Sequence, residues 1–161
     1  MSQKPERDLT VVTVFGILMD QDDRALLIRR AAEPYRGQCT VPGGHKIHGE
    51  SLKEAARREI LEETGLTMID PVLRGLMEVE VEGERRDFIS FYFSCPRWTG
   101  TLTPGPEGEL FWAGHQAALA EPALHPAFRA LAPRFFSPGP PFLARARVRR
   151  DGQGHYEVGD F

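Results

Sequence analysis

Residues 43–66 (GGHKIHGESLKEAARREILEETGL) constrain this chain more than any other stretch, because a glycine-rich loop leads into a helix that carries several glutamates. Ser51 stands three residues before Glu54, which is the spacing of a capping box and predicts the start of a helix. The helix is expected to run to about Thr64 and to stop at Gly65.

Three carboxylates of this helix, those of Glu59, Glu62 and Glu63, fall in one sector at about 100° per residue. The same sector contains apolar residues of the first two turns: Leu52, Ala55 and Ala56. Like charges three and four residues apart repel, so the cluster needs compensation. Two explanations remain open from the helix alone: a divalent cation bound by oxygen ligands, or an exposed helix whose acids pair with nearby Lys and Arg.

The loop before the helix favours the first explanation. Gly43 and Gly44 permit a tight turn and a close backbone approach to a ligand, and a carbonyl there is expected to join a metal shell. Glu50 is expected to accept a salt bridge from Arg58, which would pin the loop to the helix and give both residues a structural role.

Composition limits the class of protein. The chain has 161 residues, 41% of them hydrophobic, which fits a single domain over residues 1–161. A net charge of −3 offers no positive field for a nucleic-acid polymer. Cys39 and Cys95 form no CxxC pair and are expected to be reduced thiols. Because the first residues lack the apolar core of a signal peptide and no apolar run would span a membrane, we expect a cytoplasmic protein.

Hydrophobic patterns predict the remaining elements. Strands are expected at residues 9–18, 25–30, 72–81, 88–94 and 110–113, with a final hairpin over 142–161 that turns at 151–154. Loops are expected at 31–49 and 99–108, and a second helix within 123–136, limited by Pro126 and Pro133. Mixed strands with two helices indicate a layered α/β domain.

The stretch that opens this section resembles the signature of the Nudix family, Gx5Ex7REUxEExGU, in which U is apolar. Gly44 opens the match, and every further fixed position is present: Glu50, Arg58, Glu59, Ile60, Glu62, Glu63, Gly65 and Leu66. With fixed residues at about one in fifteen and apolar ones at about one in three, a chance match has a probability of about 10⁻⁹ per starting point. Beyond this box, residues 44–66, the chain more loosely resembles the MutT-like branch of 8-oxo-dGTP diphosphatases, in ALLIRRAAE, in GPEGELFWAGHQ and in the final hairpin.

The resemblance implies a Nudix fold, an α/β/α sandwich around a mixed β-sheet, and Mg²⁺-dependent hydrolysis in which Mn²⁺ is a substitute. The implied metal ligands are Glu59, Glu63, the carbonyl of Gly44, Glu62 directly or through water, and Glu107 in a later loop. Glu59, Glu62 and Glu107 form the implied catalytic set, with Glu59 or Glu107 as the base that deprotonates the attacking water. Bound divalent ions lower the pKa of their water and neutralise charge on phosphoryl oxygens, which supports these roles.

Substrate contacts are less sharply defined. Arg30 aligns with a basic residue that contacts substrate in several relatives, and Thr40 with an amide side chain of some 8-oxo-purine enzymes. Tyr35 and Phe128 are candidates to stack on a base, and His125 to hydrogen-bond one. Ordinary packing is the alternative for each of these side chains. Glu109 is the alternative to Glu107, because the loop aligns loosely.

Three functions follow as hypotheses. The first is hydrolysis of a nucleoside triphosphate, 8-oxo-dGTP or another (d)NTP, to a monophosphate and pyrophosphate. The second is hydrolysis of ADP-ribose, a nucleotide sugar or another nucleoside diphosphate derivative, and the third is a non-catalytic nucleotide sensor, which the complete set of box carboxylates disfavours. Residues 124–127 (LHPA) lack the aspartate with which one 8-oxo-purine branch reads its base. The expected partner is a small nucleotide, without nucleic-acid polymer or membrane, and the expected state is a monomer or homodimer.

Overall fold

The computed structural model describes residues 9–33, 35–150 and 156–158. The first half of the chain forms β1 (Leu9–Leu18), β2 (Ala25–Arg30), β3 (Cys39–Thr40), β4 (Gly43–His45), α1 (Leu52–Thr64), β5 (Leu66–Met68) and β6 (Val72–Val81). The second half forms β7 (Arg86–Cys95), β8 (Trp98–Gly100), β9 (Gly108–Ala113), α2 (His115–Ala120), α3 (Pro126–Phe136), β10 (Phe142–Arg150) and β11 (Tyr156–Val158).

The central sheet is mixed. Its strand order is β11-β10-β6-β7-β1-β4, and β1 runs parallel to β7 as β10 does to β6, whereas the other neighbours are antiparallel. A second antiparallel sheet has the order β3-β2-β9, and β5 pairs with β8. The parallel pairs require long crossovers, and the one between β1 and β7 contains α1.

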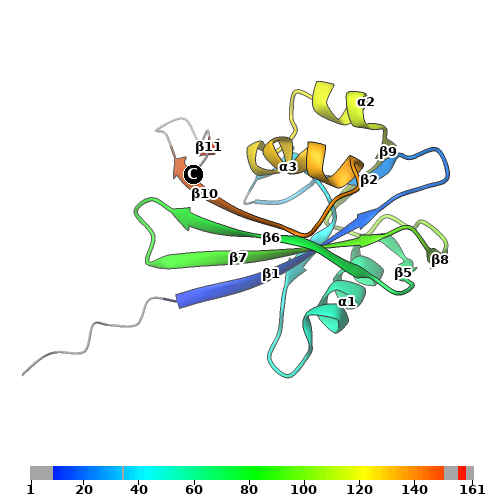
Figure 1. Cartoon of the computed structure of the whole chain (residues 1–161), viewed down its shortest axis with the longest axis horizontal. Coiled ribbons are helices and arrows are strands. Elements are labelled where there is room, and N and C mark those ends of the chain that lie inside the picture. Colours follow the sequence, from blue (N-terminus) through cyan, green and yellow to red (C-terminus); the bar gives the residue numbers. More distant parts are fainter. Residues whose placement is uncertain (1–8, 34, 151–155, 159–161) are drawn as a thin grey trace, which may run out of the picture.

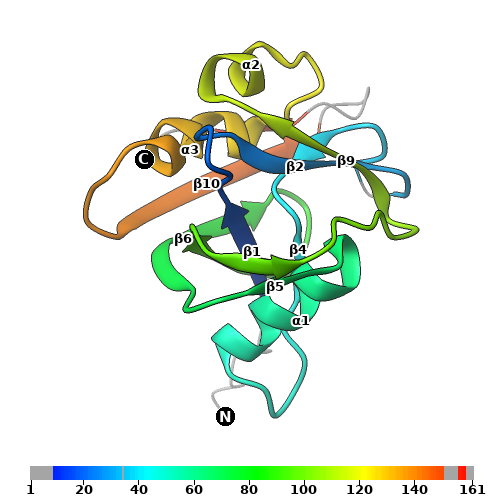
Figure 2. The same ribbon diagram turned by 90° about the vertical axis from the view of Figure 1, so that its right-hand side faces the viewer.

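Helices cover both faces of the central sheet (Figures 1 and 2). On one face α1 packs over a core cluster that contains Val14, Leu18 and Phe93. On the other face α3 packs over a cluster that contains Ile17 and Tyr92, with α2 beside it. Alternate residues of β1 therefore serve opposite cores, as the period of two in a strand requires. The expected α/β/α sandwich around a mixed sheet is confirmed.

The long elements lie where the sequence predicts them. β1, β2 and β6 have the predicted bounds, and α1 begins after Ser51 with a complete capping box and ends at Gly65 in the left-handed conformation (φ 74°). Both cysteines are buried and free, as expected. Of the helices in the described segments, none is both long and apolar enough to cross a membrane.

The short elements differ from prediction. The expected loops contain β3, β4 and β8, and the predictions miss β5 and the six-residue helix α2. The second predicted helix starts at Pro126, three residues late, because His125 is its N-cap, and Pro133 lies inside it. The final hairpin is present as the antiparallel pair β10 and β11, while its predicted turn at 151–154 lies outside the described residues.

A glycine fixes where the box loop crosses β1, which gives a test of the fold. A Cβ on Gly43 would lie 2.2 Å from the carbonyl oxygen of Val14 and 2.7 Å from the Cα of Phe15, both backbone atoms that cannot yield. We expect Gly43→Ala to lower the free energy of unfolding by about 1–3 kcal/mol in urea denaturation. Gly114→Ala is the matched control, since its Cβ would meet nothing nearer than 4.0 Å. Equal stability of the two variants would contradict this account.

Candidate active site

The packing of α1 decides how its glutamates lie. Ala55, Ala56 and Ile60 are buried against the sheet, and the helical period carries Glu63 to the same side. Glu63 is only 3% exposed, and its Oε2 accepts a hydrogen bond of 2.8 Å from the backbone N–H of Gly43. The turn at the start of β4 is thus joined to the last turn of the helix by one buried hydrogen bond.

A second carboxylate reaches Glu63 from far along the chain. Glu107 lies directly before β9, and its carboxyl group is near enough to Glu63 to disfavour the charged form of that carboxyl. Burial, together with the charges of Glu107 and Glu59, raises the pKa of the Glu63 carboxyl well above its ordinary value, although the Gly43 N–H opposes that rise. The charged form of Glu63 is therefore disfavoured, and either a proton or a nearby cation would relieve it.

Glu59 lies against the glycine turn. Its side chain is 14% exposed, and Oε1 accepts a hydrogen bond of 2.8 Å from Nη1 of Arg58. A Cβ on Gly44 would lie 2.4 Å from Oε2 of Glu59, so only a glycine leaves this carboxylate where it is. The Gly44 backbone and the Glu59 carboxylate therefore face the same small volume.

Arg58 ties the loop to the helix, as predicted. Its Nη2 and Nε donate to the two oxygens of Glu50 at 2.7 and 3.0 Å, and Nη2 also donates to the carbonyl of His45 at 2.9 Å. The hydrogen bonds from Arg58 lower the pKa of Glu50 to about 2. The contact of Arg58 with Glu62 (3.3 Å), four residues on, is an ion pair of the kind that the alternative explanation of the helix expects, whereas the contact with the adjacent Glu59 was not predicted.

Two acids lie away from this volume. The Glu62 side chain is 59% exposed, so the predicted sector of three equally placed carboxylates is only partly correct, because the packed face of α1 passes through Glu63 instead. Glu109 is 74% exposed and lies 3.7 Å from Arg29 on the neighbouring strand. Of the two loop glutamates, Glu107 is the one near Glu63.

The oxygen atoms of these residues are of the kind that a hard divalent cation binds. Their side chains are not arranged as a complete coordination shell. In the part of the chain that the structure describes, no three His, Cys, Asp or Glu side chains form a compact metal-binding group. Glu59 is turned towards Arg58, and Glu62 towards solvent. Glu107 and Glu59 nevertheless both act electrostatically on Glu63, and carboxylate and carbonyl oxygens are the ligands that Mg²⁺ takes.

Three of the predicted substrate residues lie near one another, and one of them, Arg30, adjoins the segment of Glu107. The ring of Tyr35, a residue at φ 70°, meets the ring of His125 edge to face at 4.8 Å. Burial and then the charge of Arg30 lower the pKa of His125 to about 4, so its ring is neutral near pH 7. Arg30 ends β2, and the next N–H, that of Ala31, donates to the carbonyl of Glu107 at 2.8 Å. A backbone hydrogen bond therefore joins the segment after Arg30 to the segment of Glu107.

The other two candidates are held by packing. Thr40 is half-buried on β3 and pairs with Ile28 of β2, next to Cys39, whose carbonyl accepts the N–H of His125. Thr40 is therefore the neighbour in sequence of Cys39, the residue to which His125 is hydrogen-bonded. Phe128 is 2% exposed within the α3 core cluster, which agrees with the packing alternative and leaves no ring surface for a base.

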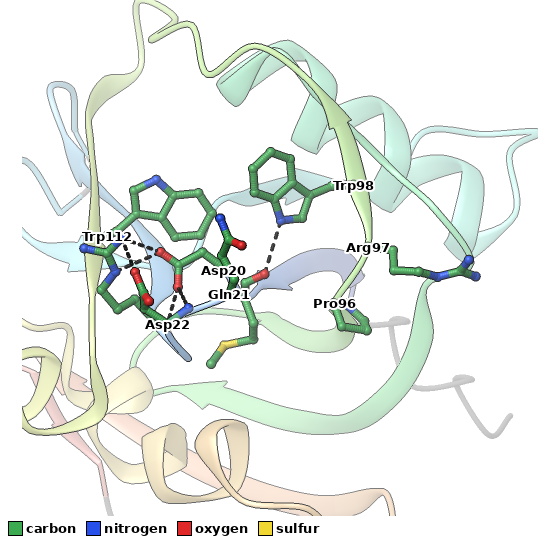
Figure 3. A pocket seen from close by; sticks show the side chains of 9 residues that line it. Asp20, Gln21, Asp22, Pro96, Arg97, Trp98 and Trp112 are labelled. Atoms are coloured by element: carbon green, nitrogen blue, oxygen red, sulfur yellow. Dashed lines mark hydrogen bonds and ion pairs between the residues drawn. The ribbon is translucent and has the colours of Figure 1, made fainter.

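A hollow of about 570 Å³ lies elsewhere (Figure 3). It is lined by the turn between β1 and β2, by residues 96–98 and by Trp112. Its polar groups bind one another: Asp20 accepts hydrogen bonds from Arg24 and from the N–H of Asp22, and the indole N–H of Trp98 donates to the carbonyl of Met19. None of the predicted site residues lines it, so the acids remain the candidate active site.

Comparison with known proteins decides the family. The model of the NUDIX domain matches residues 9–135. The chain belongs to the Nudix family. The crystal structure of the mutator MutT protein from Bacillus halodurans superposes on this Nudix chain with a TM-score of 0.75 and 25% identity, covering 91% of this chain and 94% of that one.

Two relatives are more similar in sequence. The Nudix hydrolase YvcI of Bacillus subtilis is 32% identical over 103 residues, which is 62% of this chain and 63% of the relative. An ADP-ribose pyrophosphatase of Methanocaldococcus jannaschii is 36% identical over 98 residues, which is 61% of this chain and 57% of the relative. The matched regions thus span less than two thirds of either relative's length.

The contact between Gly44 and Glu59 gives a test that separates site from fold. Because the Cβ of Gly44→Ala would displace only the flexible end of Glu59, we expect the free energy of unfolding to change by less than about 1 kcal/mol. Moving that carboxylate by about 1 Å should lower kcat/KM by about 100-fold in a nucleotide hydrolysis assay. Full activity of the Gly44→Ala variant would remove Glu59 from the site.

Proposed function

We propose that this Nudix chain is a divalent-metal-dependent hydrolase that cleaves a phosphoanhydride bond of a nucleoside triphosphate, releasing a nucleoside monophosphate and pyrophosphate. The observation that carries the proposal is the buried carboxylate of Glu63, which faces Glu107 and receives the N–H of Gly43. Acids so close together repel an anionic substrate unless cations lie between them. Cations that bridge the acids and a polyphosphate would remove the repulsion among the acids and also that between the acids and the substrate.

Mg²⁺, with Mn²⁺ as a substitute, is the cofactor that this donor set suits. Glu59, Glu63 and Glu107 with the carbonyl of Gly44 would hold it, and Glu62, at the exposed margin, would bind directly or through water. When bound, the ion lowers the pKa of its water and neutralises charge on the phosphoryl oxygens.

The chain's own residues supply orientation and a proton acceptor. Arg58 restrains Glu59 through a charge-assisted hydrogen bond, while Glu50 restrains Arg58. Glu59 and Glu107 are the two candidates for taking the proton of the attacking water. Arg30 is the group near the acids that suits a phosphate, and the Tyr35 and His125 rings suit a base.

The sequence resemblance to the MutT-like branch of 8-oxo-dGTP diphosphatases supports a triphosphate as substrate, and the likeness of fold to a MutT protein agrees with that branch. The similarity to the ADP-ribose pyrophosphatase of Methanocaldococcus jannaschii supports ADP-ribose as the second candidate, in which the same site would cleave a diphosphate linkage. A nucleotide sensor without catalysis is the least supported function, because every box carboxylate is present.

Chelation tests the cofactor. We expect excess EDTA to lower turnover of a (d)NTP at least about 100-fold, and Mg²⁺ or Mn²⁺ in excess to restore it. The reason is that the glutamate side chains cannot act as a Lewis acid without a metal ion. Circular dichroism in the same buffer should show an unchanged fold. Turnover that persists in EDTA would rule out metal dependence.

Glutamine substitutions test the ligand set and the substrate together. Glu63→Gln and Glu107→Gln should each lower kcat at least about 100-fold, whereas the matched Glu109→Gln should stay within about threefold, since its side chain is exposed and points to Arg29. The assay compares kcat/KM for (d)NTPs, 8-oxo-dGTP and ADP-ribose. Highest efficiency on ADP-ribose would select the second candidate, and equal binding without turnover in wild type and Glu63→Gln would select the sensor.

A further inference from the structure

The loop that carries Glu107, residues 101–107, is attached to the end of the box helix. The N–H of Thr103 donates to the carbonyl of Thr64 at 2.8 Å, and the N–H of Gly105 donates to the carbonyl of Glu63 at 3.3 Å. Helix ends leave carbonyls without partners, so this loop acts as a cap of α1. The loop that presents Glu107 is thereby hydrogen-bonded to the backbone of Glu63 itself.

Close contacts limit where this loop can lie. A Cβ on Gly65 would lie 2.6 Å from the carbonyl oxygen of Thr101, and a Cβ on Gly105 would lie 3.2 Å from the carbonyl oxygen of Glu62. Backbone thus packs on backbone at both points. The loop joins β8 to β9, so the positions of these two strands set where its ends lie.

The two tryptophans of the chain join those strands. Trp98 begins β8 and Trp112 lies near the end of β9, and their rings stack with centroids 5.7 Å apart and planes 23° apart (Figure 3). Both pack against the core cluster under α1, together with Leu102 and Leu110 from the segment between them. The indole N–H of Trp98 also donates to the carbonyl of Met19 at 3.2 Å, which fixes the pair to the end of β1.

We propose that Trp98 and Trp112 are positioning residues: their stacked rings close the base of the loop and hold Glu107 against Glu63. A stacked aromatic pair adds directional contact to the burial of its area, and here it joins the chain before the loop to the chain after it. This role rests on the proposed function in one respect, which is that Glu107 is taken to be a metal ligand or the general base.

Amide hydrogen exchange by NMR tests the anchoring without any assay of activity. In Trp112→Leu, the amides of Thr103 and Gly105 should exchange about tenfold faster relative to those of Val14 and Phe91, which report the central sheet. Trp112→Phe keeps a ring and should restore the rates. Phe111→Leu, on the same strand but in contact with the opposite core cluster, is the matched control and should leave the two loop amides unchanged. Unchanged loop rates in Trp112→Leu, or an equal rise at all four amides, would overturn the proposal.

A double-mutant cycle tests the link to Glu107. Trp112→Leu should lower kcat about tenfold in the wild-type background, with little change in KM, but less than about twofold in the Glu107→Gln background. Equal losses in both backgrounds would show that the pair acts elsewhere and would refute the positioning role. If wild-type protein shows no metal-dependent hydrolysis, the proposed function fails, while the exchange rates still decide the anchoring.

Discussion

The hydrogen bond between the Gly43 N–H and the buried Glu63 carboxylate holds the candidate site together. A carboxylate that is 3% exposed is costly unless its environment compensates it, and here one backbone N–H does so in part. That bond requires the glycine turn, β4 and the last turn of α1 to meet, and the position of β4 follows from its pairing with β1. The geometry of the site is thus a consequence of the central sheet.

Arg58 is the positive charge within this acidic group. It contacts Glu50, Glu59 and Glu62, and its guanidinium reaches the loop carbonyl of His45 as well. One planar cation with several donors can hold a loop and a helix in register, which a lysine cannot do with the same geometry. Within the described residues, Arg58 makes no such contact with Glu63, the acid on which Glu107 acts.

Much of this arrangement could be predicted from the sequence, because the relevant signals are local. The capping box at Ser51, the stop at Gly65 and the apolar runs of β1 and β6 fix elements within a few residues of each signal. The box spacing likewise identified the acids and the Glu50–Arg58 pair. The short strands β3, β4, β5 and β8 were missed because two or three residues show no periodicity, and only pairing with distant strands creates them. For the same reason the preference for Glu107 over Glu109 rested on resemblance alone, because the positions of both depend on how the chain around them packs.

The direction of α1 has a consequence of its own. Its last turn contains Glu62 and Glu63 and no basic residue, so the acids stand at the end where the aligned peptide dipoles place partial negative charge. The field of the helix backbone therefore adds to the repulsion among the side chains. A dication at that end would be attracted by each of these negative groups at once, so it would bind the folded chain, in which they lie together, in preference to the unfolded one. By mass action, the melting temperature of the domain would then rise with the concentration of free divalent ion.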